Sequence, residues 1–269
     1  MAVKKPAPIP REHFVNILLY SEPGDGKTTF AASGSDHPSM GPVLIISAEG
    51  GLLAVSDDPN VHHVKINSTE ELEEVFWHLR KRDEGWESYK TVVLDTLTEI
   101  QTVNLAGITE AASKTQKAKD KGRTKDDIYL EDYGTSTAAL KRLFRWFRDL
   151  PIHTVYCAWT KEKYRKDADP SIATPILVQP SLTGKLLEST CGYMDFVWLI
   201  RQNADGKRQV LWQRKAPYYA KTRSTQRIKA FLVSISGKDS PVFSLDLDES
   251  GRPVPSLGAF YDAFFAQDT

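Results

Sequence analysis

One short segment constrains the fold of this 269-residue chain more than any other. Residues 21–28 read S-E-P-G-D-G-K-T and follow an apolar run at residues 13–20 that has the length of a buried strand. The segment matches the phosphate-loop pattern G-x-x-x-x-G-K-[ST] except at its first position, where Ser21 replaces glycine. A strand, a glycine-rich turn and a helix beginning near Lys27 are therefore predicted.

Each part of this segment suits the binding of phosphate groups. Gly24 and Gly26 allow the backbone N–H groups to point inward at phosphate oxygens, and the helix N-terminus adds its dipole. Lys27 would reach the β- and γ-phosphates, and the Thr28 hydroxyl would help to hold Mg²⁺. The predicted nucleotide-binding residues are Ser21, Glu22, Pro23, Gly24, Asp25, Gly26, Lys27, Thr28 and Thr29. The alternative is a glycine-rich turn that only packs between a strand and a helix.

Apolar runs of strand length alternate with helical patterns along the chain. Further strands are predicted at residues 43–47, 61–66, 91–95, 154–159, 196–201, 208–213, 228–235 and 242–247. Helices are predicted over residues 27–33, after Ser68, and over 97–112, 140–150 and 258–266, with long loops at 113–130 and 161–181. The pattern predicts an α/β fold with a mainly parallel, doubly wound sheet and antiparallel additions at its C-terminal edge. We expect a flexible tail at residues 1–12 and a single domain over residues 13–269.

Composition narrows the class of protein. The formal net charge is zero, with 35 basic and 35 acidic residues, which argues against a wholly basic nucleic-acid coat protein but permits local basic patches. Cys157 and Cys191 are too few and too far apart for a disulfide framework or a zinc site, and indicate reduced thiols in a cytoplasmic protein. No apolar run is long enough to span a membrane, so no membrane partner is expected.

Polar residues at three further strand ends are candidate catalytic or metal-binding groups. Asp95 closes the apolar run TVVLD and would hold the Mg²⁺ shell, unless it only caps the helix that follows. Glu49 closes VLIISAEGG and would activate the attacking water as a general base, unless it is a solvent-facing turn residue. Thr160, after the run TVYCAW, could sense the γ-phosphate or have no role. In a parallel sheet all three would lie at the ligand-binding edge.

The ordered set of the phosphate loop, Glu49 in S-A-E-G-G, Asp95 in V-V-L-D-T and Thr160 resembles the RecA-like P-loop ATPase core. The resemblance covers most of residues 13–235 and is strongest to phage-encoded, single-domain ATPases of the Sak type. It implies ATP and Mg²⁺ as cofactors, DNA recombination with single-strand annealing, and a single-strand binding protein as partner. A phage-encoded protein would act in the host cytoplasm.

A second motif belongs to the same resemblance. The stretch A-K-T-R at residues 220–223 is similar to a paired-cation motif that reaches the nucleotide of a neighbouring subunit in RecA-like filaments. The resemblance implies that Lys221 and Arg223 are trans-acting catalytic residues and that the protein self-associates into rings or filaments. The alternative is a basic surface turn.

Two basic stretches are candidate sites for single-stranded DNA. Cations can follow a phosphate backbone and an aromatic side chain can stack on an exposed base, which gives salt-dependent, sequence-independent binding. The first stretch contributes Lys114, Lys117, Lys119, Lys121, Arg123 and Lys125. The second contributes Lys161, Lys163, Tyr164, Arg165 and Lys166. Lysine-rich loops are also common as solvated surface, and acidic residues follow the first stretch.

These observations favour an ATPase that hydrolyses MgATP and binds single-stranded DNA for recombination. Two other classes remain open. A P-loop small-molecule kinase would need an acceptor pocket and usually an arginine-rich lid; residues 161–170 could form such a lid, but Glu49-Gly-Gly and the Lys-Thr-Arg motif have no clear place in a kinase. A nucleotide-gated binding module would hydrolyse ATP slowly or not at all.

Overall fold

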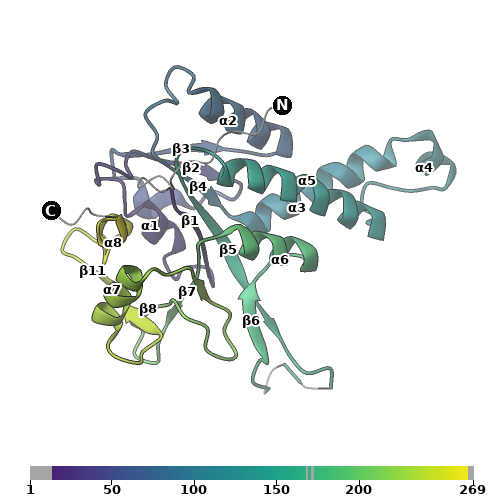
Figure 1. The fold of residues 1–269 in the computed structure, drawn as a ribbon. Coiled ribbons are helices and arrows are strands. Elements are labelled where there is room, and N and C mark those ends of the chain that lie inside the picture. Colours follow the sequence, from purple (N-terminus) through teal and green to yellow (C-terminus); the bar gives the residue numbers. More distant parts are fainter. Residues whose placement is uncertain (1–13, 168, 171–172, 266–269) are drawn as a thin grey trace, which may run out of the picture.

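The computed structural model describes residues 14–167, 169–170 and 173–265, so the predicted tail at residues 1–12 lies outside the described part. A ten-stranded sheet forms the centre of the molecule, with helices on both of its faces (Figure 1). None of the helices in the described ranges is long and apolar enough to cross a membrane.

The main path of the sheet runs β10-β8-β7-β1-β5-β4-β2-β3. Its parallel part consists of β1 (Asn16–Ser21), β2 (Val43–Ser47), β3 (Val61–Lys65), β4 (Thr91–Asp95), β5 (His153–Lys163) and β7 (Phe196–Gln202). Antiparallel pairing adds β6 (Leu177–Pro180), β8 (Arg208–Leu211), β9 (Lys221–Thr222) and β10 (Val242–Ser244). The predicted α/β fold, with a mainly parallel sheet and antiparallel additions after it, is confirmed.

Alternate side chains of the central strands enter two separate hydrophobic cores, as the two-residue period of a strand requires. Leu18 and Tyr20 of β1 belong to the first core, whereas Leu19 belongs to the second. The first core lies under α2 (Thr69–Lys81), α3 (Leu97–Ser113), α5 (Leu130–Arg148) and α6 (Gly184–Tyr193). The second lies under α1 (Lys27–Ala32), α7 (Gln226–Ser236) and α8 (Leu257–Phe265). Nearly continuous burial on both faces explains why these strands read as unbroken apolar runs.

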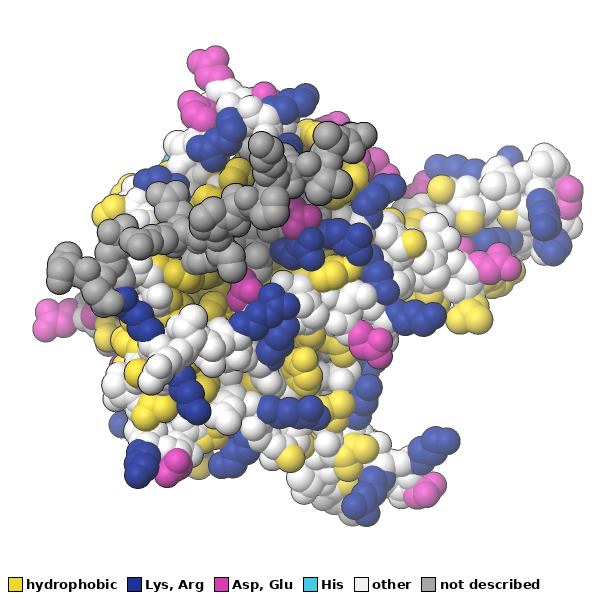
Figure 2. Space-filling model, in the orientation of Figure 1, with side chains coloured by type: hydrophobic (Ala, Val, Ile, Leu, Met, Phe, Trp, Pro, Cys, Tyr) yellow, Lys and Arg dark blue, Asp and Glu magenta, His cyan; other side chains and the backbone are white. Residues whose placement is uncertain are grey.

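Two basic projections extend from the body of the molecule (Figure 1). The first, here called the helical arm, comprises residues 97–148, in which α3 and α5 lie side by side and α4 (Gln116–Asp120) sits near the tip. The second, here called the strand hairpin, is the antiparallel pairing of Thr160–Lys163 in β5 with β6. Figure 2 shows open space between the two projections, which leave the body on the same side.

The predicted strand at residues 228–235 is wrong, because this segment forms the helix α7. Ile228 and Leu232 are its buried residues and stand one helical turn apart, while the Thr225 side chain caps the first turn by accepting from the Ile228 N–H at 3.2 Å. The β-branched residues of the segment suggested a strand, but their spacing fits the helical period. Residues 242–247 form the short strands β10 and β11 (Asp246–Leu247), and β11 pairs with β12 (Pro253–Val254).

Both long loops contain more regular structure than the sequence predicts. In the first, α3 continues to Ser113 and α4 follows at Gln116. In the second, β5 continues to Lys163 and pairs with β6, so the chain leaves the sheet as an extended hairpin. The polar residues of these loops follow no clear strand or helix period, so the sequence did not predict α4 or β6.

Candidate nucleotide-binding site

The phosphate loop leaves the carboxyl end of β1 and turns directly into α1. Gly24 and Gly26 have φ angles of +87° and +96°, a left-handed conformation that side chains disfavour, and Gly26 is the N-cap residue of α1. The Lys27 ammonium donates to Ser21 Oγ at 3.1 Å and to the Glu22 carbonyl at 3.1 Å. The lysine is 7% exposed and is therefore held at the centre of the loop rather than in solvent.

The Thr28 hydroxyl and the Asp95 carboxylate meet beside this loop. Thr28 Oγ1 donates to Asp95 Oδ2 at 2.7 Å, and Asp95 is 6% exposed. Burial raises the pKa of Asp95, the charge of Glu49 raises it further, and the hydrogen bond from Thr28 opposes the rise. A hydroxyl and a carboxylate oxygen are hard donors of the kind that Mg²⁺ takes, so the residues present fit this ion.

Glu49 lies next to Asp95 because β2 and β4 pair in parallel and end together, with Ser47 opposite Asp95. The Thr96 hydroxyl donates to Glu49 Oε1, which fixes the direction of the glutamate side chain. Thr96 is also the N-cap of α3 and accepts from the Glu99 N–H at 3.3 Å. The helix is therefore capped by Thr96, which leaves Asp95 to face Thr28.

Thr160 lies at the other side of the phosphate loop. Its hydroxyl donates to Glu22 Oε1, and the neighbouring Trp159 is opposite Ser21 in the β1–β5 pairing. Burial raises the pKa of Glu22, and the nearby carboxylates of Glu162 and Asp25 raise it further. The structure thus brings Lys27, Thr28, Glu49, Asp95 and Thr160 to one edge of the sheet, as the sequence predicts for parallel strands.

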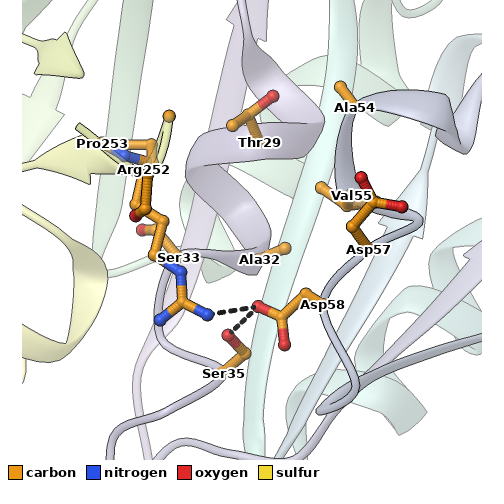
Figure 3. A pocket seen from close by; sticks show the side chains of 12 residues that line it. Thr29, Ala32, Ser33, Ser35, Ala54, Val55, Asp57, Asp58, Arg252 and Pro253 are labelled. Atoms are coloured by element: carbon orange, nitrogen blue, oxygen red, sulfur yellow. Dashed lines mark hydrogen bonds and ion pairs between the residues drawn. The ribbon is translucent and has the colours of Figure 1, made fainter. Parts of the chain in front are cut away.

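A cavity of about 320 Å³ runs beside α1, starting at Thr29 immediately after the phosphate loop (Figure 3). Ala54 and Asp57 face Thr29 across it, and Arg252 and Pro253 close it from the β11–β12 side. Asp58 shuts the far end by accepting from Ser35 Oγ at 2.6 Å and pairing with Arg252 at 3.5 Å. Its volume is within the range of small-molecule sites.

Lys221 and Arg223 are remote from the phosphate loop of their own chain. The Lys221 ammonium donates to the carbonyls of Cys191 and Met194, both at 2.8 Å, at the C-terminal end of α6. The Arg223 guanidinium donates to the Gly192 carbonyl at 2.8 Å and pairs with Asp195 at 3.1 Å. Lys221 is opposite Val197 of β7, which in turn is opposite Leu18 of β1. Because Leu18 is three residues before Ser21 and a strand rises about 3.3 Å per residue, Lys221 is roughly 10 Å along the sheet from Ser21. Arg223 is farther away.

The predicted DNA-binding residues divide into exposed and engaged groups. Arg123 is engaged: its guanidinium pairs with Asp132 and lies 4.3 Å from the centre of the Tyr129 ring, with 10% of its side chain exposed. Lys114 is exposed but bonded to Glu110 at 2.7 Å, and the Tyr164 hydroxyl donates to Glu162. The remaining cations are exposed on the two projections: Lys117, Lys119, Lys121, Lys125, Lys161, Lys163, Arg165 and Lys166.

Sequence reasoning missed several residues of this region. Thr96 follows Asp95 directly, and its hydrogen bond to Glu49 could have been anticipated only from the pairing of β2 with β4. Arg208 of β8 lies against Gly26 of the phosphate loop. Asp57 and Arg252 reach the α1 cavity from segments almost 200 residues apart, a proximity that no local pattern signals.

Comparison with known families agrees with this geometry. The family model described as AAA domain matches residues 13–224, which include the phosphate loop, β2, β4 and both basic projections. No curated protein matches the chain. The chain therefore belongs to the AAA domain family and carries a nucleotide-binding domain of the P-loop NTPase type.

Proposed function

We propose that this protein is a RecA-like ATPase that hydrolyses MgATP and acts on single-stranded DNA in recombination. The observation that carries the proposal is the grouping of Lys27, Thr28, Glu49 and Asp95 at one edge of the sheet. A small-molecule kinase needs no glutamate at the end of β2, whereas hydrolysis needs a base that can accept a proton from water.

The nucleotide would bind across two adjoining parts of the site. Its phosphates would occupy the loop formed by residues 21–28, where Lys27 donates to them. Its nucleoside would extend into the α1 cavity beside Thr29, where Asp57 offers a carboxylate to polar groups of the sugar or base (Figure 3). ATP in preference to GTP rests on the family resemblance.

Each residue at the sheet edge has a separate task in hydrolysis. Thr28 and Asp95 would hold Mg²⁺, which supplies positive charge against the phosphates when it is bound. Lys27 stabilises negative charge that develops on the β- and γ-phosphate oxygens. Glu49, oriented by the Thr96 hydroxyl, accepts the proton of the attacking water at a carboxylate oxygen. Thr160 would report on the γ-phosphate through its hydrogen bond to Glu22.

Lys221 and Arg223 would complete the site of a neighbouring subunit in a ring or filament. Their distance from their own phosphate loop supports action in trans, since neither side chain spans it. A mixture tests this: Lys27→Ala subunits supply an intact Arg223, and Arg223→Gln subunits supply an intact phosphate loop. Turnover by the mixture, where each variant alone is inactive, is the expected result, and an inactive mixture would contradict the trans assignment.

Single-stranded DNA would bind to the exposed cations of the helical arm and the strand hairpin. The two projections leave the body on the same side (Figure 2), so a single strand can contact both. Binding of this kind weakens with salt, because each neutralised phosphate releases counterions. A single-strand binding protein would be the partner that presents the DNA.

ATP turnover with and without single-stranded DNA, at low and high salt, tests the proposal. The expected result is stimulation by DNA that high salt abolishes and that Lys27→Ala eliminates. Changing Lys117, Lys119, Lys121 and Lys125 together to Gln should reduce DNA stimulation and the salt dependence, while turnover without DNA stays the same. Turnover that ignores DNA, or that rises only with a small-molecule acceptor, would favour the kinase or the gated module instead.

A further inference from the structure

Arg208 is placed against the phosphate loop by the β7–β8 hairpin. Gln202 of β7 is opposite Arg208 of β8, and the adjacent inward residues Ile200 and Val210 belong to the core under α1. Because side chains alternate along a strand, Arg208 and Gln202 also point to the α1 face of the sheet. The loop turns into α1 on this face, so both side chains extend toward it.

The contact between Arg208 and the loop is close. A Cβ atom at Gly26 would lie 3.3 Å from Arg208 Nε and 3.7 Å from its Cζ. The charge of Arg208 also helps to counter the rise in the pKa of Asp25 that burial causes. The guanidinium therefore lies over the glycine that immediately precedes Lys27.

The guanidinium of Arg208 has an unpaired donor in the described part of the chain, although its charge acts on nearby Asp25. Its Nε is buried without a hydrogen-bond acceptor, and no carboxylate of the described residues forms an ion pair with it. A guanidinium stays charged at every physiological pH, and a buried donor without an acceptor is costly. An acceptor with negative charge, supplied by a ligand, would remove this cost.

The acidic residues around the loop favour a second protein cation beside a phosphate ligand, in addition to Lys27 and the proposed Mg²⁺. Glu22, Asp25, Glu49 and Asp95 surround the loop, whereas Lys27 is the cation that the loop itself supplies. A nucleoside diphosphate or triphosphate adds several negative charges to this group. Arginine suits the task because its planar fork of donors matches phosphate oxygens.

We infer that Arg208 is a cis-acting phosphate-binding residue, whose guanidinium donates to phosphate oxygens of a nucleotide held by the loop of the same chain. The inference rests on the proposed nucleotide site and adds to it a cation that no family motif supplies. It differs from the role of Lys221 and Arg223, because Arg208 already touches its own loop. Each subunit would therefore bind phosphate tightly before it meets a neighbour.

Titration of the full chain with fluorescent ADP and Mg²⁺ tests this role through Arg208→Gln and Arg208→Lys. Arg201→Gln is the matched control, because Arg201 is on the same hairpin, points to the opposite face and lies 4.6 Å from the centre of the Tyr218 ring. We expect Arg208→Gln to weaken ADP binding about 10- to 100-fold, Arg208→Lys to weaken it less, and Arg201→Gln to leave it within about 2-fold. Inorganic pyrophosphate should compete less well against the Arg208 variants by a similar factor, which a purely structural role would not produce.

Each failure has a distinct signature. Wild-type protein that binds no nucleotide would overturn the proposed function, and this inference with it. Lys27-dependent binding that Arg208→Gln leaves unchanged would overturn this inference alone. If Arg208→Gln does not fold by circular dichroism, the pyrophosphate competition of Arg208→Lys decides. At an ATP concentration where Arg208→Gln alone turns over slowly, mixing it with Lys27→Ala subunits should give no additional turnover, because the mixture contains no site with both residues; turnover restored toward the wild-type rate would contradict action in cis.

Discussion

The two ends of the parallel strands both carry buried polar side chains, but these side chains have different kinds of partner. At the amino end, the Thr91 hydroxyl donates to the Met40 carbonyl at 2.6 Å, and His153 Nδ1 accepts from the Val15 N–H at 3.2 Å. At the carboxyl end, the hydroxyls of Thr28, Thr96 and Thr160 donate to side-chain carboxylates. Their acceptors are Asp95, Glu49 and Glu22, respectively.

The two ends therefore differ in how readily their hydrogen bonds can be exchanged for bonds to a ligand. A hydrogen bond to the backbone satisfies a group that has no alternative partner in the fold, so losing it costs stability. A hydrogen bond between two side chains can be exchanged for a ligand when one of them rotates. The bonds between side chains at the carboxyl end can therefore be replaced by bonds to a ligand. The bonds to the backbone at the amino end cannot be replaced in this way without a loss of stability. Substitutions at the two ends should accordingly affect activity and stability separately.

The largest expected effect is at the carboxyl end. Lys27→Ala removes the loop ammonium and should lower kcat/KM for ATP by about 1000-fold, since both binding and transition-state stabilisation are lost. Thermal unfolding of the nucleotide-free protein should change far less than activity, because the acceptors of the lysine, on Ser21 and Glu22, all belong to its own loop. A steady-state ATPase assay with a melting curve measures both. A variant that melts far below wild type would show that this end is structural too.

Glu49→Gln should reduce kcat by about 100- to 1000-fold and leave nucleotide affinity within a few-fold. The amide keeps the shape of the carboxylate and can still accept from Thr96, but it cannot take a proton from water. Single-turnover hydrolysis and ADP titration separate the two quantities. Equal losses in both would place Glu49 in binding instead of proton transfer.

Lowering the pH should destabilise the amino end through His153. The pKa of His153 falls from 6.5 to about 4, chiefly because the imidazole is buried; the hydrogen bond to the Ser39 carbonyl opposes this fall and the charge of His37 adds to it. The folded state thus favours the neutral imidazole. The contribution of His153 to the free energy of unfolding is therefore complete above pH 6.5 and is lost as the pH falls toward 4. Each pKa unit corresponds to about 1.4 kcal/mol, so the loss reaches about 3 kcal/mol.

Urea unfolding of wild type and His153→Gln between pH 7 and 4.5 measures this loss. The variant has no imidazole to protonate, so its stability should depend less on pH than that of wild type. Parallel curves for the two proteins would assign the acid sensitivity to other groups.

The smallest expected effect is that of Thr91→Val. Valine keeps the volume of threonine but leaves the buried Met40 carbonyl without its donor, which should lower the free energy of unfolding by about 1 to 2 kcal/mol. ATP turnover at a temperature where the variant is fully folded should be unchanged. A fall in turnover without a fall in stability would contradict the separation of the two ends.

The placement of the phosphate loop, Glu49 and Asp95 at one edge of the sheet could be predicted from the sequence, because it depends on where each apolar run ends. Ser21, Ser47 and Asp95 each end an apolar run, and parallel strands place such ends at one edge. The same reasoning gave the two-faced burial of the sheet. The two basic stretches could also be predicted, but not that they lie on projections or that Arg123 pairs with Asp132 within the arm.

What the sequence did not predict depends on contacts between distant segments or on competing local signals. Arg208 reaches Gly26 only because β7 joins β1, and Arg252 reaches Asp58 only after the chain returns to α1. Residues 228–235 suggest a strand because isoleucine, valine and phenylalanine are enriched in strands, although their spacing here fits a helix. Pairing and packing, not composition, decide these cases.

The helical arm begins directly after Thr96, whose hydroxyl donates to Glu49. Thr96 caps α3 and donates to Glu49, and the 17 residues of α3 continue as one helix to Ser113. At 1.5 Å per residue this rod is roughly 25 Å long, so a tilt of about 10° at Thr96 moves the far end by about 4 Å. One end of this helix therefore contacts Glu49 through Thr96 and the other lies among the arm lysines, so a small change of its angle at Glu49 would displace the lysines by several ångströms.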